Sequence, residues 1–222
     1  MPSPHYEALC AVAQEAARRA GAELARLFHL PRRTHEKGLR DIVTDADLAA
    51  ERIVVETIRH YYPDHAILSE ESGESAGVAG QQWIIDPLDG TTNYARGIPY
   101  FCVAVAVAEA GQPVAGAVYD PLRETMYHAA RGGGAFCNAR RLRVSERRRM
   151  LDLLLMCDWP RADAPRAEVM RMAHATGPLV GGLRTLGSAA LELCAVAEGA
   201  SDGYFHLTLH LWDMAAPALI IE

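Results

Sequence analysis

Five acidic residues stand where an apolar segment ends or where a helix is expected to begin: Asp47, Glu70, Asp86, Asp89 and Asp213. Carboxylate oxygens are hard ligands, and proteins commonly bind Mg²⁺ through a few carboxylates together with a substrate phosphate. Ligands of layered α/β folds also bind at strand ends and helix starts. Together the five acids predict a site for Mg²⁺ and a phosphate ester, whose hydrolysis by water requires no cysteine or serine nucleophile.

The stretch around Asp86 carries the most specific pattern. A short apolar run ends at Asp86, which predicts a buried strand with a carboxylate at its C-terminal end. Pro87 cannot continue a strand ladder, so we expect the chain to turn there and to bring Asp89 close enough to share one cation. Gly90 permits close backbone approach to a ligand. Residues 91–93 suit the start of a helix, where free N–H groups favour an anion.

Each acid alone also has an ordinary structural explanation. The D-x-x-D spacing of Asp86 and Asp89 is compatible with a solvated turn. Thr44 and Asp47 fit a capping box with Asp in place of Glu, and an acid at that position is favoured by the helix dipole. Asp213 fits an N-cap of the last helix. The case for a cation site therefore depends on the five acids occurring together.

Periodicity predicts helices and strands that hold these acids in a single α+β unit. The segments 32–40 and 72–82 are expected to be loops, the first with hairpin character. An antiparallel meander is predicted between helical segments at both ends of the chain. Gly132–Gly134 lacks nucleotide-loop spacing and is read as a turn. Helices are predicted at about 6–28, 46–62, 165–176, 189–198 and from 211, and strands at 66–68, 103–108, 114–119, 125–130, 151–156 and 204–205.

Composition excludes several classes of function. The 222 residues are 50% hydrophobic, enough for one sizeable core. The net charge of −6 predicts no nucleic-acid partner. The five cysteines are scattered, which indicates neither a zinc site nor a disulfide framework. No signal peptide and no apolar run of membrane-spanning length is evident, so we expect a cytoplasmic protein without a membrane partner.

The motifs share their order and approximate spacing with a known family. They resemble the signature of the inositol monophosphatase family, which are Mg²⁺-dependent and often lithium-sensitive phosphatases. The resemblance implies a layered αβαβα sandwich, also found in fructose-1,6-bisphosphatase, and a homodimer. Residues 1–222 are expected to form one catalytic domain that is short at its C-terminal end. The matching units are Asp41–Asp47, Ser69–Ser72, Asp86–Asn93, Gly187–Ala189 and Trp212–Ala216.

The resemblance also implies roles for individual residues. Two or three Mg²⁺ would be held by Glu70, Asp86, Asp89, Asp213 and the carbonyl oxygen of Leu88. Thr91, oriented by Asp47, would position and activate the attacking water, and Glu70 is expected to assist. The substrate would contact Asp89, Gly90, Thr91, Ala189 and His206, with the phosphate received by the backbone N–H groups of Gly90 and Thr91.

Two departures from the family pattern bear on function. His206 stands where the family often has a glutamate that binds inositol hydroxyl groups, so recognition of the alcohol should differ. The chain also ends at Glu222 inside the helix that begins near Trp212. Family members continue, and we therefore expect this sequence to lack the last elements of the fold and to expose a sheet edge.

The leading hypothesis is a phosphomonoesterase that hydrolyses a small polyol or sugar phosphate, such as inositol 1-phosphate, by metal-activated water. Histidinol phosphatase and fructose-1,6-bisphosphatase are alternatives within the family. A non-catalytic regulatory partner protein is the alternative from another class. The intact set of acids favours catalysis, because five buried carboxylates without metal would repel one another.

Overall fold

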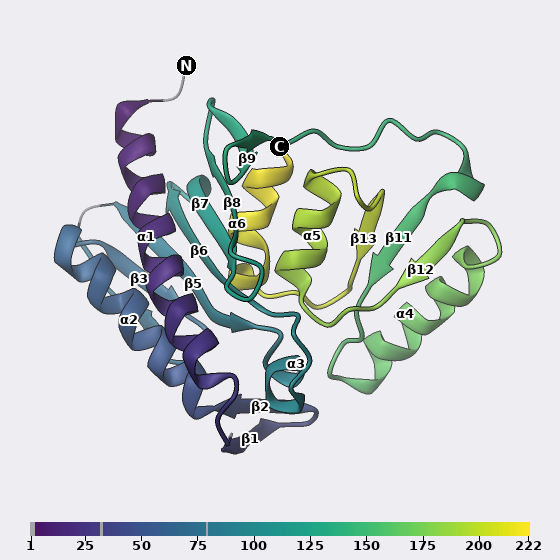
Figure 1. The fold of residues 1–222 in the computed structure, drawn as a ribbon, viewed down its shortest axis with the longest axis horizontal. Coiled ribbons are helices and arrows are strands. Elements are labelled where there is room, and N and C mark those ends of the chain that lie inside the picture. Colours follow the sequence, from purple (N-terminus) through teal and green to yellow (C-terminus); the bar gives the residue numbers. More distant parts are fainter. Residues whose placement is uncertain (1–2, 32, 79) are drawn as a thin grey trace.

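The computed structural model describes residues 3–31, 33–78 and 80–222 and has five layers (Figure 1). Helices α1 (Pro4–Leu27) and α2 (Asp45–Tyr61) cover one face of an eight-stranded sheet. Helices α5 (Ala189–Ala197) and α6 (Leu211–Ile221) cover the other face. A three-stranded sheet and α4 (Asp163–Thr176) complete the stack. The predicted layered αβαβα sandwich is confirmed.

The large sheet has the strand order β10-β9-β8-β7-β6-β5-β3-β4. Strands β5 to β9 form an antiparallel meander, as predicted, and β3 runs parallel to β5. One short strand, β4, lies in the segment that we expected to be a loop. The strands are β3 (Ala66–Ser69), β4 (Gly73–Ser75), β5 (Gln81–Asp89), β6 (Cys102–Glu109), β7 (Gln112–Asp120), β8 (Thr125–Ala130), β9 (Gly134–Cys137) and β10 (Arg140–Arg141).

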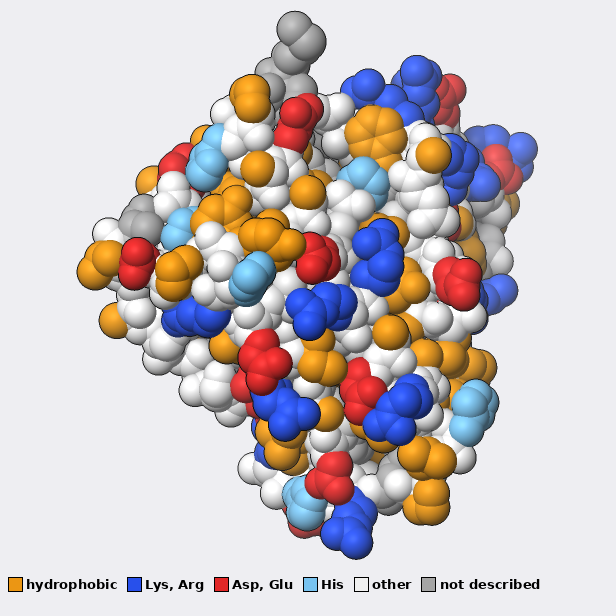
Figure 2. Space-filling view, turned by 60° about the vertical axis from the view of Figure 1, so that its left-hand side comes forward, with side chains coloured by type: hydrophobic (Ala, Val, Ile, Leu, Met, Phe, Trp, Pro, Cys, Tyr) orange, Lys and Arg blue, Asp and Glu red, His pale blue; other side chains and the backbone are white. Residues whose placement is uncertain are grey.

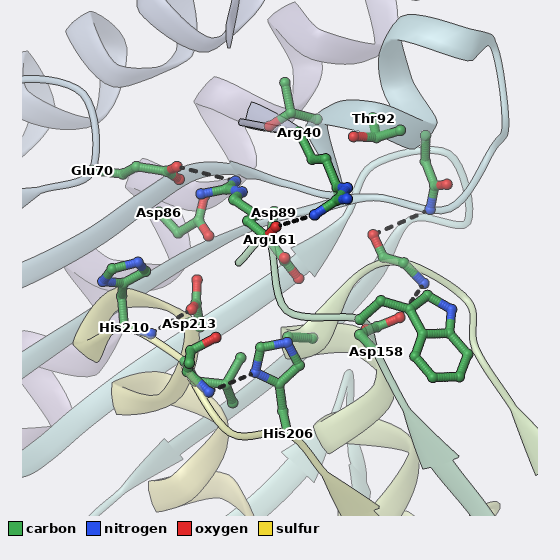
Figure 3. A pocket seen from close by; sticks show the side chains of 18 of the residues that line it. Arg40, Glu70, Asp86, Asp89, Thr92, Asp158, Arg161, His206, His210 and Asp213 are labelled. Atoms are coloured by element: carbon green, nitrogen blue, oxygen red, sulfur yellow. Dashed lines mark hydrogen bonds and ion pairs between the residues drawn. The ribbon is translucent and has the colours of Figure 1, made fainter. Parts of the chain in front are cut away.

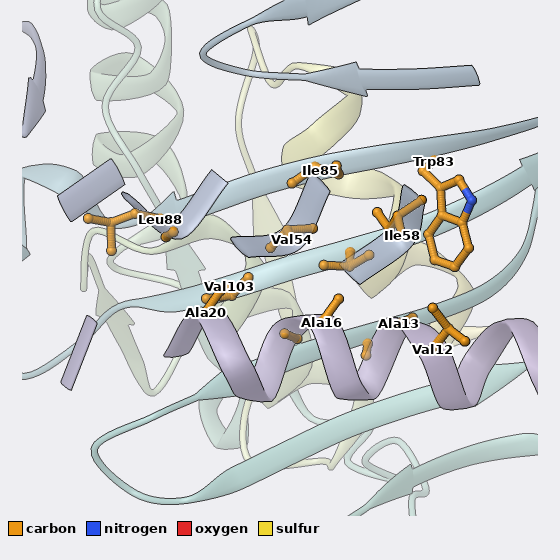
Figure 4. Close-up of a cluster of buried hydrophobic side chains, with 14 of the residues drawn as sticks. Val12, Ala13, Ala16, Ala20, Val54, Ile58, Trp83, Ile85, Leu88 and Val103 are labelled. Atoms are coloured by element: carbon orange, nitrogen blue, oxygen red, sulfur yellow. The ribbon is translucent and has the colours of Figure 1, made fainter. Parts of the chain in front are cut away.

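The central strands are buried on both faces, which explains their continuous apolar runs. Along β5, Trp83 and Ile85 pack against α1 and α2, whereas Ile84 packs in the cluster with α5 and α6. Figure 4 shows Trp83 and Ile85 beside Val54 and Ile58 of α2. Successive side chains of a strand point to opposite faces, so one run of sequence fills both cores.

Strand β5 corrects our expectation at Pro87. The proline does not end the strand, which continues to Asp89 with an irregular register. Asp86 pairs with Ala104 and Asp89 with Cys102, so β5 contains one residue more than its partner between these pairs. This β-bulge accommodates Pro87, whose missing N–H removes one ladder hydrogen bond.

The small sheet consists of parallel strands β11 (Leu154–Cys157), β12 (Gly182–Arg184) and β13 (Gly203–Phe205), with β11 in the middle. The strand that we predicted at 151–156 begins instead with the 3₁₀ turn η1 (Met150–Asp152). In α4, Val169 is the buried residue, and Met170 is half exposed.

Two short elements border the pocket described below. Strands β1 (Thr34–Gly38) and β2 (Asp41–Thr44) form a hairpin, and α3 (Thr91–Arg96) follows β5 directly.

Charged side chains of both signs share the surface on the α1 and α2 side with isolated apolar ones (Figure 2). Within the described residues, no helix combines the length and apolar character that a bilayer span requires.

Candidate active site

A cavity of about 610 Å³ opens where the ends of β3 and β5 meet the β11–α4 connection and the β13–α6 loop. Nine of the ten residues that we predicted for the site line it (Figure 3). The tenth, Asp47, lies behind Thr91 and is buried. The nine lining residues are Glu70, Asp86, Leu88, Asp89, Gly90, Thr91, Ala189, His206 and Asp213.

The two aspartates of β5 are anchored by the chain around them. Asp86 Oδ1 accepts the Leu88 N–H at 3.0 Å. Asp89 Oδ2 accepts the Ser188 hydroxyl at 2.6 Å and the Ala190 N–H at 2.8 Å at the start of α5. Both aspartates therefore face the α5 and α6 side of the sheet, three positions apart in sequence. The β-bulge makes this possible, because a regular strand would place them on opposite faces.

Asp213 approaches from the first turn of α6. Its Oδ2 accepts the His210 N–H at 2.7 Å, which fixes the side chain at the helix start. Burial, with the nearby charge of Asp89, raises the pKa of Asp213 to about 7. Glu70 follows β3, and its Oε1 lies 3.3 Å from Lys37 Nζ and 4.0 Å from Arg161 Nη2.

The carboxylates carry more negative charge than their surroundings neutralise. Burial raises the pKa of Asp86 well above its ordinary value, and the charges of Glu70, Asp89 and Asp213 raise it further. Burial also raises the pKa of Asp89 to about 6. Acids that are buried together repel one another unless a cation or a proton is shared between them.

The donor set fits Mg²⁺ in its chemistry. Asp86, Asp89 and Asp213 each commit one oxygen to the chain, and the other oxygen accepts no hydrogen bond from the described residues. Hard oxygen donors with residual negative charge are what Mg²⁺ requires. Across residues 3–31, 33–78 and 80–222, no three His, Cys, Asp or Glu side chains lie close enough together to hold an ion. The Glu70 carboxylate contacts Lys37 and Arg161.

Thr91 and Asp47 form a polar pair next to the carboxylates. The Thr91 hydroxyl lies 3.1 Å from Asp47 Oδ1 and 3.0 Å from the Leu88 carbonyl oxygen, and can donate to either. Burial raises the pKa of Asp47 to about 6, although Thr44 donates to it from both N–H and hydroxyl. The expected capping box of α2 is present, with Asp47 serving both the helix and Thr91.

Sequence reasoning missed a second group of lining residues. Asp158 follows β11 directly, and that strand-end position was the signal by which we found Glu70. Our predicted strand ended at residue 156, one residue too early, so Asp158 did not stand directly after it. The arginines gave no signal, because their position depends on the packing of the β1–β2 hairpin against the β11–α4 connection. The missed residues include Arg40, Asp158, Trp159, Arg161, Arg166 and Tyr204.

Comparison with known proteins gives the family. The sequence model described as the inositol monophosphatase family matches residues 5–222. The chain belongs to the inositol monophosphatase family. It shares 36% identity and a TM-score of 0.82 with the structure of inositol monophosphatase from Anabaena, covering 97% of this chain and 81% of that one. Membership in the inositol monophosphatase family supports a phosphatase fold and, in general terms, Mg²⁺-dependent hydrolysis.

Other members of the family with high similarity carry a different name. "Nus factor SuhB" of Pasteurella multocida is 41% identical over 216 residues, covering 95% of this chain and 80% of the relative. The same name belongs to the Escherichia coli relative, 40% identical over 215 residues with the same coverage. The structure of extragenic suppressor protein suhB from Bartonella henselae has a TM-score of 0.93 and 38% identity, covering 96% of this chain and 84% of that one.

These names contradict our prediction that the protein has no nucleic-acid partner. The Pasteurella multocida and Escherichia coli relatives are called Nus factors. The prediction rested on the net charge of −6, and a net charge averages over the whole surface. Locally the balance is reversed, because residues 140–149 contain six arginines and one glutamate, and all six arginines are exposed.

Proposed function

We propose that the protein is a Mg²⁺-dependent phosphomonoesterase that acts on a small polyol or sugar phosphate, such as inositol 1-phosphate. The observation that carries the proposal is the convergence of Glu70, Asp86, Asp89 and Asp213 on one cavity with raised aspartate pKa values. Such a cluster is costly without a cation. The proposal includes two or three Mg²⁺ held by these residues and the Leu88 carbonyl oxygen, in one catalytic unit located in the cytoplasm.

The chain supplies the proton-handling groups. Mg²⁺, when bound, would neutralise charge on the phosphoryl group and make a water molecule in the site more acidic. The Thr91 hydroxyl would orient this water, since it sits between Asp47 and the Leu88 carbonyl oxygen. Asp47, with a pKa of about 6, would accept a proton near neutral pH. Backbone N–H groups at Gly90 and Thr91 would receive the phosphate.

The alternatives within the family concern the alcohol half of the substrate. Ala189 and His206 line the cavity beyond the acids and would contact that half. Histidinol phosphate and fructose 1,6-bisphosphate therefore remain to be compared with inositol 1-phosphate. The shared acids predict one metal requirement for all three esters.

The test is phosphate release from these three esters with Mg²⁺ and with chelator. Wild type is compared with Asp86→Asn, which keeps the shape of the side chain and removes its charge. Asp152→Asn, on the exposed turn η1, is the matched control. We expect release that requires both Mg²⁺ and Asp86 and that the control retains. If well-folded wild type releases no phosphate from any of the three esters, the proposed phosphatase activity is refuted.

A regulatory role is the second candidate, and the relatives' names support it more directly than they support catalysis. We propose that the exposed segment 140–149 is the part of this chain that serves such a role. Arg143 and Arg148 have no ion pair among the described residues. Arg140, Arg147 and Arg149 pair with Glu198, Asp202 and Asp152, respectively. In Figure 2, Lys and Arg side chains gather at the upper right of the molecule. Clustered guanidinium groups bind phosphate backbones.

This role is tested by binding of a fluorescently labelled single-stranded RNA at several salt concentrations. We expect weaker binding for a variant with Arg143→Ala and Arg148→Ala, and a smaller dependence of affinity on salt. A variant with Arg52→Ala and Arg171→Ala, on α2 and α4, removes the same charge elsewhere as the control. Equal losses in both variants would mean a general charge effect and no role for the segment.

A further inference from the structure

Glu51 is a buried acid on α2 that lies outside the cavity. Its exposed fraction is 8%, and it is not among the residues that line the cavity. Residues four positions apart share one face of a helix, so Asp47 and Glu51 project from the same side of α2. Asp47 contacts Thr91, whereas Glu51 contacts the connection between β3 and β4. A buried carboxylate is costly unless its oxygens accept hydrogen bonds, so the partners of Glu51 indicate its role.

One oxygen of Glu51 accepts three hydrogen bonds from the turn that contains Glu70. Glu51 Oε2 accepts the N–H groups of Glu71 and Ser72 at 3.2 Å each, and it also accepts the Ser69 hydroxyl. These residues lie where β3 turns into β4. Glu51 therefore holds the residue before Glu70 and the two residues after it.

The backbone of Glu70 is attached to β5 by a further hydrogen bond. The Glu70 N–H donates to the Ile85 carbonyl oxygen at 3.2 Å, and Ile85 directly precedes Asp86. The turn is thus held between α2 and β5, and the side chain of Glu70 lines the cavity. Figure 3 shows the side chains of Glu70 and Asp86 at the same edge of the cavity. Glu51 therefore helps to set the position of Glu70 relative to Asp86.

Loss of the Glu51 acceptor would release this turn. Ser69 is completely buried, and the N–H groups of Glu71 and Ser72 would lose their acceptor together with the Ser69 hydroxyl. Backbone N–H groups need an acceptor, so the turn would have to rotate them towards water. Because Glu70 lies between the residues that Glu51 holds, its side chain would move with them.

We propose that Glu51 is a positioning residue for Glu70 and thereby determines the affinity of the cavity for Mg²⁺. This inference rests on the phosphomonoesterase function proposed above, in which Glu70 is a metal ligand. Mg²⁺ requires near-ideal octahedral geometry with short distances, so it tolerates little displacement of a ligand. Residues that hydrogen-bond to a metal ligand or its support commonly change metal affinity about 10- to 100-fold when they are replaced.

The experiment measures Mg²⁺ binding to the metal-free protein by isothermal titration calorimetry, independently of phosphate release. Glu51→Ala should weaken Mg²⁺ binding roughly 10- to 100-fold. Glu51→Asp keeps the charge but shortens the side chain by one methylene group, so it should also weaken binding. Glu51→Gln keeps an oxygen at the same reach that can accept from the same donors, and it should restore most of the affinity.

Two control variants on α2 separate this role from a role in folding alone. Val54 is completely buried in the apolar cluster beneath the sheet, so Val54→Ala should lower Tm and leave the Mg²⁺ affinity unchanged. Glu56→Ala removes a carboxylate from the exposed face of the same helix and should change neither quantity. Melting curves of all the variants give the Tm values for this comparison.

Each outcome decides the inference. If Glu51→Ala or Glu51→Asp lowers Tm but binds Mg²⁺ as tightly as wild type, Glu51 serves the fold alone and the positioning role is wrong, while the proposed function stands. If Glu51→Gln binds as weakly as Glu51→Ala, the charge of Glu51 determines the affinity, and the role in holding the turn is also wrong. The Glu51→Asp variant decides the question if Glu51→Ala does not fold. If wild type binds no Mg²⁺, the proposed function fails and the inference fails with it.

Discussion

Replacing Asp213 with asparagine should stabilise the protein in the absence of metal. The Asp213 carboxylate is mostly buried near Asp89 and Glu70, and its charge is unfavourable there. An asparagine has the same shape and can still accept the His210 N–H through its side-chain oxygen. The substitution therefore removes the charge without removing the hydrogen bond that begins α6.

The magnitude follows from the pKa. A rise in the pKa of Asp213 from 3.8 to about 7 corresponds to at most about 4 kcal/mol of unfolding free energy. Because the folded state binds the proton more tightly than the unfolded state, this stability is fully present below pH 3.8. It is lost as the pH rises through about 7. The advantage of Asp213→Asn should accordingly be near zero at pH 4 and close to its full value at pH 8.

The assay is urea or thermal unfolding with chelator at pH 5 and pH 8. For a chain of this size, about 4 kcal/mol corresponds to a rise in Tm of roughly 8–16 °C. With Mg²⁺ the order should reverse, because the wild type gains binding free energy that the variant has partly lost. The comparison with and without Mg²⁺ thus separates the contribution of Asp213 to metal binding from its contribution to stability.

Asp202→Asn is the matched control of opposite sign. Burial opposes ionisation of Asp202, but hydrogen bonds from Ser145, the Leu154 N–H and Arg147 outweigh it and lower the pKa of Asp202. Its stabilising effect is present at neutral pH and is lost as the pH falls through that lowered pKa. Asp202→Asn should therefore destabilise at pH 8. Our reasoning is refuted if Asp213→Asn also destabilises the chelated protein at pH 8, or if its effect is the same at pH 5.

Three further results are expected. Thr91→Ala should lower kcat by about 10²- to 10⁴-fold in steady-state kinetics. In the double variant with Asp47→Asn, the decrease in kcat should be much smaller than the product of the two single decreases, because the two residues act as one unit. At pH 7 Glu192→Gln should change the unfolding free energy measured in urea by less than about 1 kcal/mol, because burial raises the pKa of Glu192 to about 9 and the acid is already neutral. Glu192→Ala should cost about 2–5 kcal/mol, because it leaves a cavity at a fully buried position and removes the acceptor of the Leu186 N–H, whereas the Gly187 N–H keeps Asp158 as an acceptor. Gly90→Ala should lower the free energy of unfolding by at least about 1–2 kcal/mol and should therefore lower Tm. The φ of Gly90 is 96°, and an added Cβ would lie 3.0 Å from the Tyr100 carbonyl oxygen. An unchanged Tm would contradict this prediction.

The acids that line the cavity could be located from the sequence because each follows a local rule. Glu70 and Asp86 come directly after apolar runs, and Asp213 lies in the first turn of a helix. Strand ends in a layered fold meet at one edge, so local positions were enough to predict a common site. The roles of these residues stay predictions until metal binding is measured.

The arginines of the cavity and the pair of acids Asp158 and Glu192 could not be located in that way. Arg40 and Arg161 meet because the carbonyl oxygen of Arg161 accepts from Arg40 Nη1 at 2.6 Å, across 121 residues of sequence. Glu192 faces Asp158 because α5 packs against β13, the strand beside β11, and the sequence position of Glu192 fits an ordinary helical residue. Contacts of this kind depend on tertiary packing, which neither periodicity nor capping signals describe.

The extra residue in β5 also determines which insertions and deletions the fold can accept. Asp86 and Asp89 face the same layer only because β5 has one residue more than β6 between their pairing partners. Inserting one residue into β6 between Cys102 and Ala104 would restore a regular ladder, in which residues three positions apart point to opposite faces. One of the two aspartates would then point towards the helices α1 and α2, into a cluster that contains Leu88 and Val103. A sequence can thus retain all five acids and still lose the site through the length of a single strand, so alignments of this motif should be read for length as well as for identity.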